Sequence, residues 1–463
     1  MISAIEAATV ANRFGYGARP GELASLGSGA RDALSAQLHG PPPVIGDGLK
    51  ASHQVLAQAI ELREQSRGSE VNDATAQVTL GMRLRELNRP IYEDEALARF
   101  SAAATSQRSF IERLVQFWSN HFAVSIDKVA VLGIAGAMER EAIRPNVLGN
   151  FTDLLFAVER HPAMLLYLDN HLSAGPNSPA ASAVAKRGNG RTLGLNENLA
   201  REILELHTLG VDGGYTQQDV ASFAGMITGW SIGGDVGRLR GGDAGKFYFR
   251  ENFHEPGGKA LLGKTYRQDG IEQGEHALRD LAALPATARH IATKLARHFI
   301  ADEPPAAVVE RLAKVFLGTQ GDLPTLYRAL IDAPQSWQKS LSKFKTPAEF
   351  IYSTYRGLAL PVENVRRALG PFEALGQRNF QPGSPAGWPD RSVDWDGSSA
   401  LLKRIEWADA LGQRMGSRFN AARLADAMLG ATLGSATRTS IARAQDGAQA
   451  LTLLLSSPEF MRR

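Results

Sequence analysis

Apolar residues recur at three- and four-residue spacing along most of this chain, and this helical periodicity restricts its fold more than any other feature. Such spacing places apolar side chains on one face of an α-helix, which must then pack against another element. We therefore expect a mainly α protein, built as one large multi-helix domain. Fifteen stretches carry the pattern: residues 49–68, 75–88, 93–124, 129–144, 147–158, 197–209, 217–229, 287–301, 305–317, 322–333, 346–358, 362–369, 399–415, 419–428 and 446–454.

Strand signals are scarce. Residues 246–250 (KFYFR) and 259–263 (KALLG) flank the turn-rich sequence HEPGG, and we expect them to pair as one small β-hairpin element. Residues 229–233 (GWSIG) match the GxSxG pattern, but a predicted helix precedes Ser231 where a nucleophile elbow needs a strand. We interpret this serine as part of a turn at a helix end.

The connections between the predicted helices are mostly too short to separate independent domains. We expect a single domain over residues 1–463, which could subdivide into an N-terminal helical subdomain over 1–90 and a C-terminal one over 285–463. Longer loops at 173–195, 233–245 and 376–397 are places where function is often found.

Composition excludes several classes of protein. The chain has no Cys, which excludes disulfides, cysteine–zinc sites and thiol nucleophiles. Its 51 Lys and Arg against 48 Asp and Glu leave a net charge of +3, too small to predict a nucleic-acid partner. No stretch approaches the ~18 apolar residues of a membrane span, and the first residues lack the pattern of a signal peptide. We expect no integral membrane segment and a cytoplasmic protein, or an exported one if a leader was removed.

The densest polar segment is residues 196–210 (NENLAREILELHTLG), which we expect to be an amphipathic helix. At about 100° per residue, Glu202 and Glu205 share one stripe and His207 points nearly opposite. Two carboxylates three residues apart can bind a metal ion or divide acid and base roles. The alternative is a solvated face in which Glu197, Arg201 and Glu205 form a ladder of weak ion pairs.

Histidines could complete such a site. His121 lies at the edge of the apolar face of the predicted helix over 111–122, and His254 lies in the expected hairpin turn near Lys259. A lone His on an apolar face is commonly a core residue, whereas loops more often carry functional groups. Asp169 follows an apolar run and is either a further carboxylate of the site or the end of a helix.

Several uncommon words in fixed order resemble the large bacterial family catalogued as domain of unknown function 1800 (DUF1800), over nearly the whole chain. They are ANRFGYG at 11–17, QFWSNHF at 116–122, LYLDN at 166–170, the segment 196–210, TGW at 228–230, HEPGGKALLG at 254–263, the helix around 294–299 and GWPD at 387–390. The resemblance implies no activity. Relatives usually have His-Asp-x-Gly where this chain has His254-Glu-Pro, and many of them look exported.

Three functions follow from these residues. The first is an enzyme with a His/carboxylate site, a divalent-metal-dependent hydrolase or oxidoreductase in which His121, Glu202 and His254 hold the metal. Glu205 would assist catalysis there, and Arg201 and Lys259 would suit an anionic substrate or a developing oxyanion. The second is a metal-free two-carboxylate enzyme acting on glycosides, with Asp169 as the partner carboxylate. The third is a non-enzymatic binding or assembly protein.

Overall fold

The computed structural model describes residues 2–67, 74–187, 192–234, 240–338 and 341–463, and it confirms a mainly α fold with a small β element. The first helices are α1 (Ile2–Thr9), η1 (Val10–Phe14), α2 (Glu22–Leu26), α3 (Ala30–Ala36), α4 (Ser52–Arg67), α5 (Ala74–Thr105), α6 (Ser109–His121), α7 (Ala135–Met138), η3 (Glu139–Ile143), α8 (Arg144–Asn146) and α9 (Phe151–Glu159). The middle of the chain adds α10 (Pro162–Tyr167), α11 (Pro179–Lys186), α12 (Asn198–Glu202), η5 (Ile203–His207), α13 (Gln217–Met226), α14 (Ile271–Ala282), α15 (Pro285–Phe299), α16 (Ala306–Gly318) and α17 (Leu323–Ile331). The last helices are α18 (Pro347–Gly357), α19 (Val365–Ala374), α20 (Ser398–Met415), α21 (Ala421–Leu429), α22 (Ser435–Ala442), α23 (Gly447–Leu455) and α24 (Pro458–Met461).

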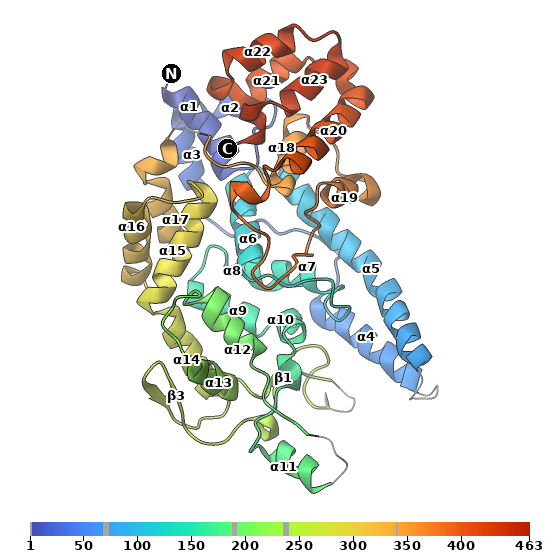
Figure 1. Ribbon diagram of the computed structural model, residues 1–463, viewed down its shortest axis with the longest axis vertical. Helices are drawn as coiled ribbons and strands as arrows, with labels where there is room; N and C mark the ends of the chain where they lie inside the picture. The colour runs from blue at the N-terminus through green and yellow to red at the C-terminus, as the bar shows by residue number, and fades with distance from the viewer. Residues whose placement is uncertain (1, 68–73, 188–191, 235–239, 339–340) are drawn as a thin grey trace.

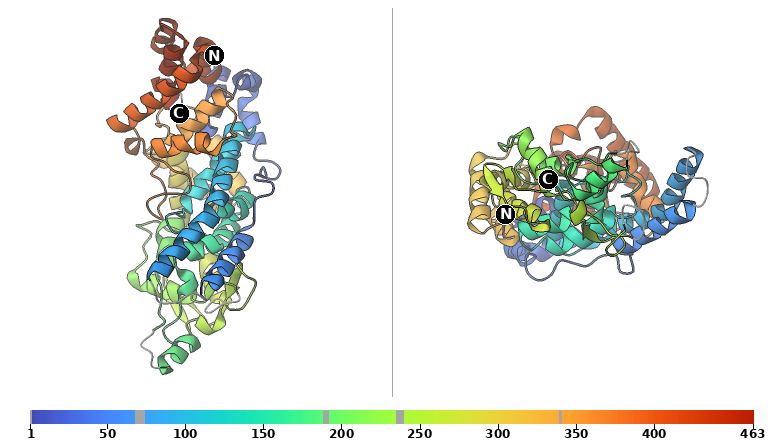
Figure 2. Two further views of the ribbon diagram at one scale, coloured as in Figure 1. Left: turned by 90° about the vertical axis from the view of Figure 1, so that its right-hand side faces the viewer. Right: turned by 90° about the horizontal axis from the view of Figure 1, so that it is seen from below.

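The molecule is elongated, with both termini near one end (Figures 1 and 2). Helices α18 to α24 and α1 to α3 gather at that end, and α11, α13 and the strands lie at the other. Helices α4 and α5 contact each other and extend from the body on one side (Figure 1). No helix in the described ranges is long and apolar enough to cross a membrane.

The buried side chains form two hydrophobic clusters. The first cluster draws on residues 7–333, including Leu114, Trp118 and Leu295, together with Phe380. The second cluster joins Tyr16, Phe100, Ala103 and Ala104 to buried residues between 344 and 461. Contacts connect the two, since Asn12 Nδ2 of η1 donates a hydrogen bond to the Met428 carbonyl at 3.3 Å. Whether residues 1–90 and 285–463 act as subdomains remains a prediction.

The strand segments are where the sequence placed them, but their expected pairing was wrong. β2 (Phe247–Phe249) pairs with β1 (Trp230–Ile232), and β3 (Lys259–Leu261) pairs with β4 (Lys264–Tyr266), both antiparallel. Leu262 and Gly263 both have positive φ, so β3 and β4 are joined by a tight two-residue turn, which is a favoured hairpin connection. Ser231 therefore lies in a strand and not in a turn, and its Oγ donates to the His171 carbonyl at 3.1 Å.

The expected helix boundary near residue 90 was also wrong. Helix α5 continues through Pro90, although proline removes one helical hydrogen bond, and the helix ends instead at Thr105. The sequence over 93–124 therefore supplies the end of one long helix and all of α6.

A π-helical turn changes the angular spacing of the residues around His207. Residues 203–207 form the π-helix η5, in which the Leu209 N–H donates to the Leu204 carbonyl at 3.0 Å, five residues back. The α-helical angle of 100° per residue does not apply to such a turn, so residues five apart, such as Glu202 and His207, come closer in angle. His207 acts electrostatically on Glu202, and it is fully buried, whereas Glu202 is partly exposed.

Candidate active-site pocket

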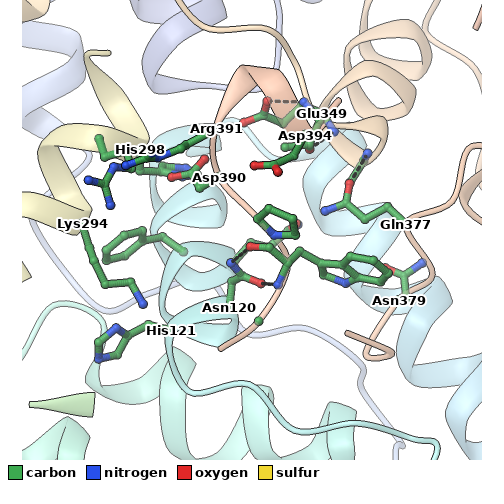
Figure 3. A pocket seen from close by; sticks show the side chains of 18 of the residues that line it. Asn120, His121, Lys294, His298, Glu349, Gln377, Asn379, Asp390, Arg391 and Asp394 are labelled. Atoms are coloured by element: carbon green, nitrogen blue, oxygen red, sulfur yellow. Dashed lines mark hydrogen bonds and ion pairs between the residues drawn. The ribbon is translucent and has the colours of Figure 1, made fainter. Parts of the chain in front are cut away.

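A pocket of about 470 Å³ opens where α6, α15, the start of α18 and the loop over residues 376–397 meet. Its walls carry charged, amide and aromatic side chains from both hydrophobic clusters, such as Phe117 and Tyr352. The volume is in the range that small-molecule sites occupy. Figure 3 shows the labelled side chains converging on this space from the four segments.

His121 ends α6, and its side chain lines the pocket. Its Nε2 lies 3.1 Å from the His207 carbonyl oxygen, and because a carbonyl only accepts, Nε2 carries the hydrogen. Nδ1 therefore has a lone pair, and this atom is buried with no hydrogen-bond partner among the described residues. The side chain is 1% exposed. Burial, followed by the charge of Lys294, holds the pKa of His121 well below its usual value, so the ring is neutral.

Lys294 extends its amino group from α15 toward the His121 ring (Figure 3). Within the described part of the chain, this amine makes no ion pair or hydrogen bond, and the side chain is only partly exposed. Burial lowers the pKa of Lys294 to about 8, although Asp390 opposes the effect. One turn earlier on α15, His290 Nε2 donates to the Leu206 carbonyl at 3.0 Å. The end of η5 thus fixes the tautomers of two histidines beside this amine.

On the opposite side of Lys294, His298 belongs to a buried ionic network. Its Nδ1 donates to Asp390 Oδ2 at 3.1 Å, and its Nε2 accepts from Arg113 Nη1 at 3.4 Å. Both ring nitrogens are occupied, and burial lowers the pKa of His298. Arg113 in turn pairs with Glu349, whose Oε1 lies 2.9 Å from Arg463 Nε. Burial would raise the pKa of Glu349, but Arg113 and Arg463 together hold it well below its usual value.

The loop that delivers Asp390 is clamped to α6. Asn120 accepts from the Trp388 N–H at 2.7 Å and donates to the Trp388 carbonyl at 2.9 Å. Gly387 has φ of +82°, and a Cβ there would lie 2.3 Å from the Asn120 carbonyl oxygen, so only glycine fits. Asp390 is further held by Lys343, which reaches its carboxylate at 3.5 Å. The GWPD sequence is therefore the strap that closes one side of the pocket.

Comparison with known proteins identifies the chain at this point. A family model described as "Protein of unknown function (DUF1800)" matches residues 9–462. The chain belongs to the DUF1800 family. No curated protein and no solved structure matches it. The match includes every segment that builds the pocket of this DUF1800 protein.

Of the residues expected to form the site, only His121 lines this pocket. Arg201 is on the surface, with Nη2 3.1 Å from Glu197 Oε2 and 2.8 Å from Gln217 Oε1, as the first step of the expected ladder. Glu202 and Glu205 are partly exposed on the same segment. Burial raises the pKa of Glu202, and the nearby Glu205 adds to the effect while His207 opposes it.

The remaining expected residues have other partners. Asp169 pairs with Lys128 at 2.6 Å, in a left-handed backbone conformation. Lys259 donates to the Glu255 and Gly257 carbonyls at 2.7 and 3.0 Å and to Gln273 at 2.8 Å, which uses all three N–H groups. His254 is buried, with Nδ1 3.1 Å from the Thr228 carbonyl. These contacts hold the β3–β4 hairpin to α13 and α14.

Across the ranges that the structure describes, no three His, Asp or Glu side chains are grouped so that they could hold a metal ion. The metal set of His121, Glu202 and His254 thus remains a prediction. The pocket residues that sequence reasoning missed are Lys294, His298 and Asp390. Two signals pointed to them, because the helix over 294–299 and the GWPD word both belong to the family resemblance.

Proposed function

We propose that this DUF1800 protein is an enzyme that moves protons on a small anionic molecule held in the pocket, with His121 Nδ1 as the base. The observation that carries the proposal is the locked tautomer of His121: its ring lines the pocket, and its Nδ1 lone pair has no hydrogen-bond partner among the described residues. A buried acceptor without a partner is costly, and such groups are concentrated at functional sites.

Uncompensated positive charge supports an anionic ligand. Five Lys and Arg residues line the pocket, and three of them are paired: Arg99 with Glu139, Arg378 with Glu373 and Arg391 with Glu303. Lys294 and Arg297, three residues apart on α15, have no carboxylate within ion-pair distance in the described ranges. A carboxylate or phosphate on the substrate would supply the missing charge.

The ligand would also tune the base. The charge of Lys294 lowers the pKa of His121, and a bound anion would offset that charge and raise the pKa toward neutrality. A general base works best with a pKa near the working pH, so the site becomes competent only when the anion is present. The neutral His298, with both nitrogens engaged, positions Asp390 and the strap and does not act as a second base.

A ligand screen tests this proposal. Small carboxylates and phosphates are added to the full chain, and we expect some to raise the melting temperature with increasing concentration. Binding should weaken at least about tenfold in Lys294→Met, equivalent to about 1.4 kcal/mol. His121→Asn should still bind the ligand but lose proton exchange or turnover, whereas His276→Asn, at an exposed position on α14, should behave as wild type. Equal binding and turnover in all four proteins would contradict the proposal.

The divalent-metal hydrolase or oxidoreductase remains a second candidate, because a neutral imidazole with a free lone pair is also a metal ligand. Elemental analysis of the purified protein tests it. Stoichiometric metal that is lost in both His121→Asn and Glu202→Gln would favour this candidate over the metal-free one. The glycoside alternative gains no support from the pocket, since its Asp390 and Glu349 are both neutralised by cations.

A further inference from the structure

Lys294 differs in its surroundings from the other pocket cations. Among the described residues that line the pocket it is the one primary amine, and its helix neighbours one turn away, His290 and Arg297–His298, are not anions. Two other lysines with little exposure in the described ranges have oxygen partners: Lys259 has three acceptors and Lys343 has Asp302 at 2.8 Å. Lys345 Nζ also lacks a hydrogen-bond partner, but it lies over the Phe460 ring at 4.3 Å and does not line the pocket. An amine beside a free imidazole lone pair is arranged as a nucleophile and not as a structural cation.

We propose that Lys294 forms an imine with the carbonyl group of a small oxo acid, an aldehyde or ketone that also carries a carboxylate. The inference rests on the proposed function and names its substrate class. The amine nitrogen attacks the carbonyl carbon, a C–N bond forms, and a proton moves from nitrogen to oxygen to give a carbinolamine. Loss of the oxygen as water leaves the C=N bond, so no oxidant or reductant is needed.

The groups beside Lys294 assist the steps of imine formation. The His121 ring lies beside the amine (Figure 3), and its Nδ1 can take the proton that nitrogen loses, then return it to the departing oxygen. Arg297, three residues further on α15, lies on the same side of the helix and suits the carboxylate of the substrate. Burial favours the uncharged, nucleophilic form of the amine, as the lowered pKa of Lys294 indicates.

Reductive trapping tests the inference on the full chain. The protein is incubated with glyoxylate and cyanoborohydride, which converts an imine to a stable carboxymethyl amine, and the modified lysines are located by peptide mass spectrometry. We expect Lys294 to be labelled at least about tenfold faster than Lys314, which is exposed on α16, and the labelling rate to rise with pH around 8. Lys314→Met should leave the Lys294 rate unchanged.

A second aldehyde, without a carboxylate, separates the role of Arg297 from that of Lys294. Arg297→Met should slow labelling by glyoxylate at least about fivefold and leave labelling by uncharged acetaldehyde within about twofold of wild type, because only glyoxylate has a carboxylate to bind. Labelling of Lys294 no faster than Lys314 would overturn the imine. If anions still raised the melting temperature in a Lys294-dependent way, the proposed function would survive that result. Absence of any anion effect would instead overturn the proposed function.

Discussion

At the scale of single residues, the pocket contains basic groups whose protonated, charged forms are destabilised by burial. His121 is neutral because it is buried beside a lysine, and the amine of Lys294 is held where Asp390 compensates its burial only in part and no carboxylate forms an ion pair with it in the described ranges. Neither condition improves folding. Sites that carry such costs commonly keep them for function, and removing the cost stabilises the protein.

Lys294→Met should therefore stabilise the protein near pH 7. The pKa of Lys294 falls from its usual 10.5 to about 8 on folding, so the folded protein loses this proton more readily than the unfolded chain. The free energy of unfolding should rise with pH between about 8 and 10.5 in wild type, and this part of the rise should be absent in the variant. We expect a gain of about 1–2 kcal/mol at pH 7 from urea unfolding, allowing for partial solvent contact. A loss of stability would show that the amine has a partner.

Glu202→Gln should give a smaller gain with the opposite pH dependence. Burial raises the pKa of Glu202 above 4.5, so folding disfavours its charged form. Wild-type stability should fall as the pH rises from about 4.5 through the raised pKa, and the variant should lack that fall. Glu197→Gln, on the exposed ladder, should change stability by no more than about 0.5 kcal/mol at any pH. Equal effects of the two substitutions on melting curves would mean that Glu202 is a solvated surface residue.

At the scale of elements, η5 shows where sequence reasoning reached its limit. The amphipathic pattern over 197–209 correctly predicted a helix, but an α-helical wheel cannot detect a π-helical turn, because the extra residue leaves no mark in apolar spacing. His207 was consequently separated from its neighbours. In the structure its Nδ1 lies 2.7 Å from Glu159 Oε1 of α9, and both side chains are buried.

The link between η5 and α9 predicts an asymmetric response at position 159. Glu159→Leu should destabilise the protein by about 3 kcal/mol, because it removes the carboxylate that contacts the buried imidazole of His207. Glu159→Gln retains an acceptor oxygen and should cost about 1 kcal/mol. Urea unfolding measures both values. Similar costs for the two substitutions would mean that packing, and not the polar contact, fixes η5.

Long-range pairing was the other part of the fold that the sequence concealed. The segments that form β2 and β3 were correctly predicted as strands, but they do not pair with each other. β2 pairs with β1 and β3 pairs with β4, and residue composition alone did not favour these pairings. The pocket shows the same limit at larger separation. Asp390 and His298 are 92 residues apart, and only the folded chain brings them together. Local pattern identifies elements, whereas contacts between them depend on tertiary packing.

At the scale of the whole molecule, the network of Arg113, Glu349 and Arg463 joins the two hydrophobic clusters. Arg113 belongs to α6 in the first cluster and also donates from Nε to the Gly15 carbonyl at 3.0 Å. Glu349 begins α18 in the second. All three side chains are buried, so each charge depends on the others for compensation.

Glu349→Leu should uncouple the clusters. Two buried guanidinium groups would lose their anion, at a cost of about 3–5 kcal/mol, and α18 to α24 should open at lower urea than α6 and α9. Hydrogen exchange followed by mass spectrometry resolves the two regions. In wild type we expect both to open together, and to lose stability in acid as the pH falls below 4.5 through the lowered pKa of Glu349. Two separate openings in wild type would indicate independent subdomains.

The position of the pocket on this boundary has a kinetic consequence. Its walls come from both clusters, with Phe117 on one side and Tyr352 on the other. A molecule bound between them must leave before the two halves can separate, so occupancy slows the opening of the chain as well as shifting its equilibrium. The rate of proteolysis in the presence of each candidate metabolite would then rank the metabolites by affinity before any reaction is known. The physiological substrate could be found as the molecule that most prolongs the lifetime of the folded protein.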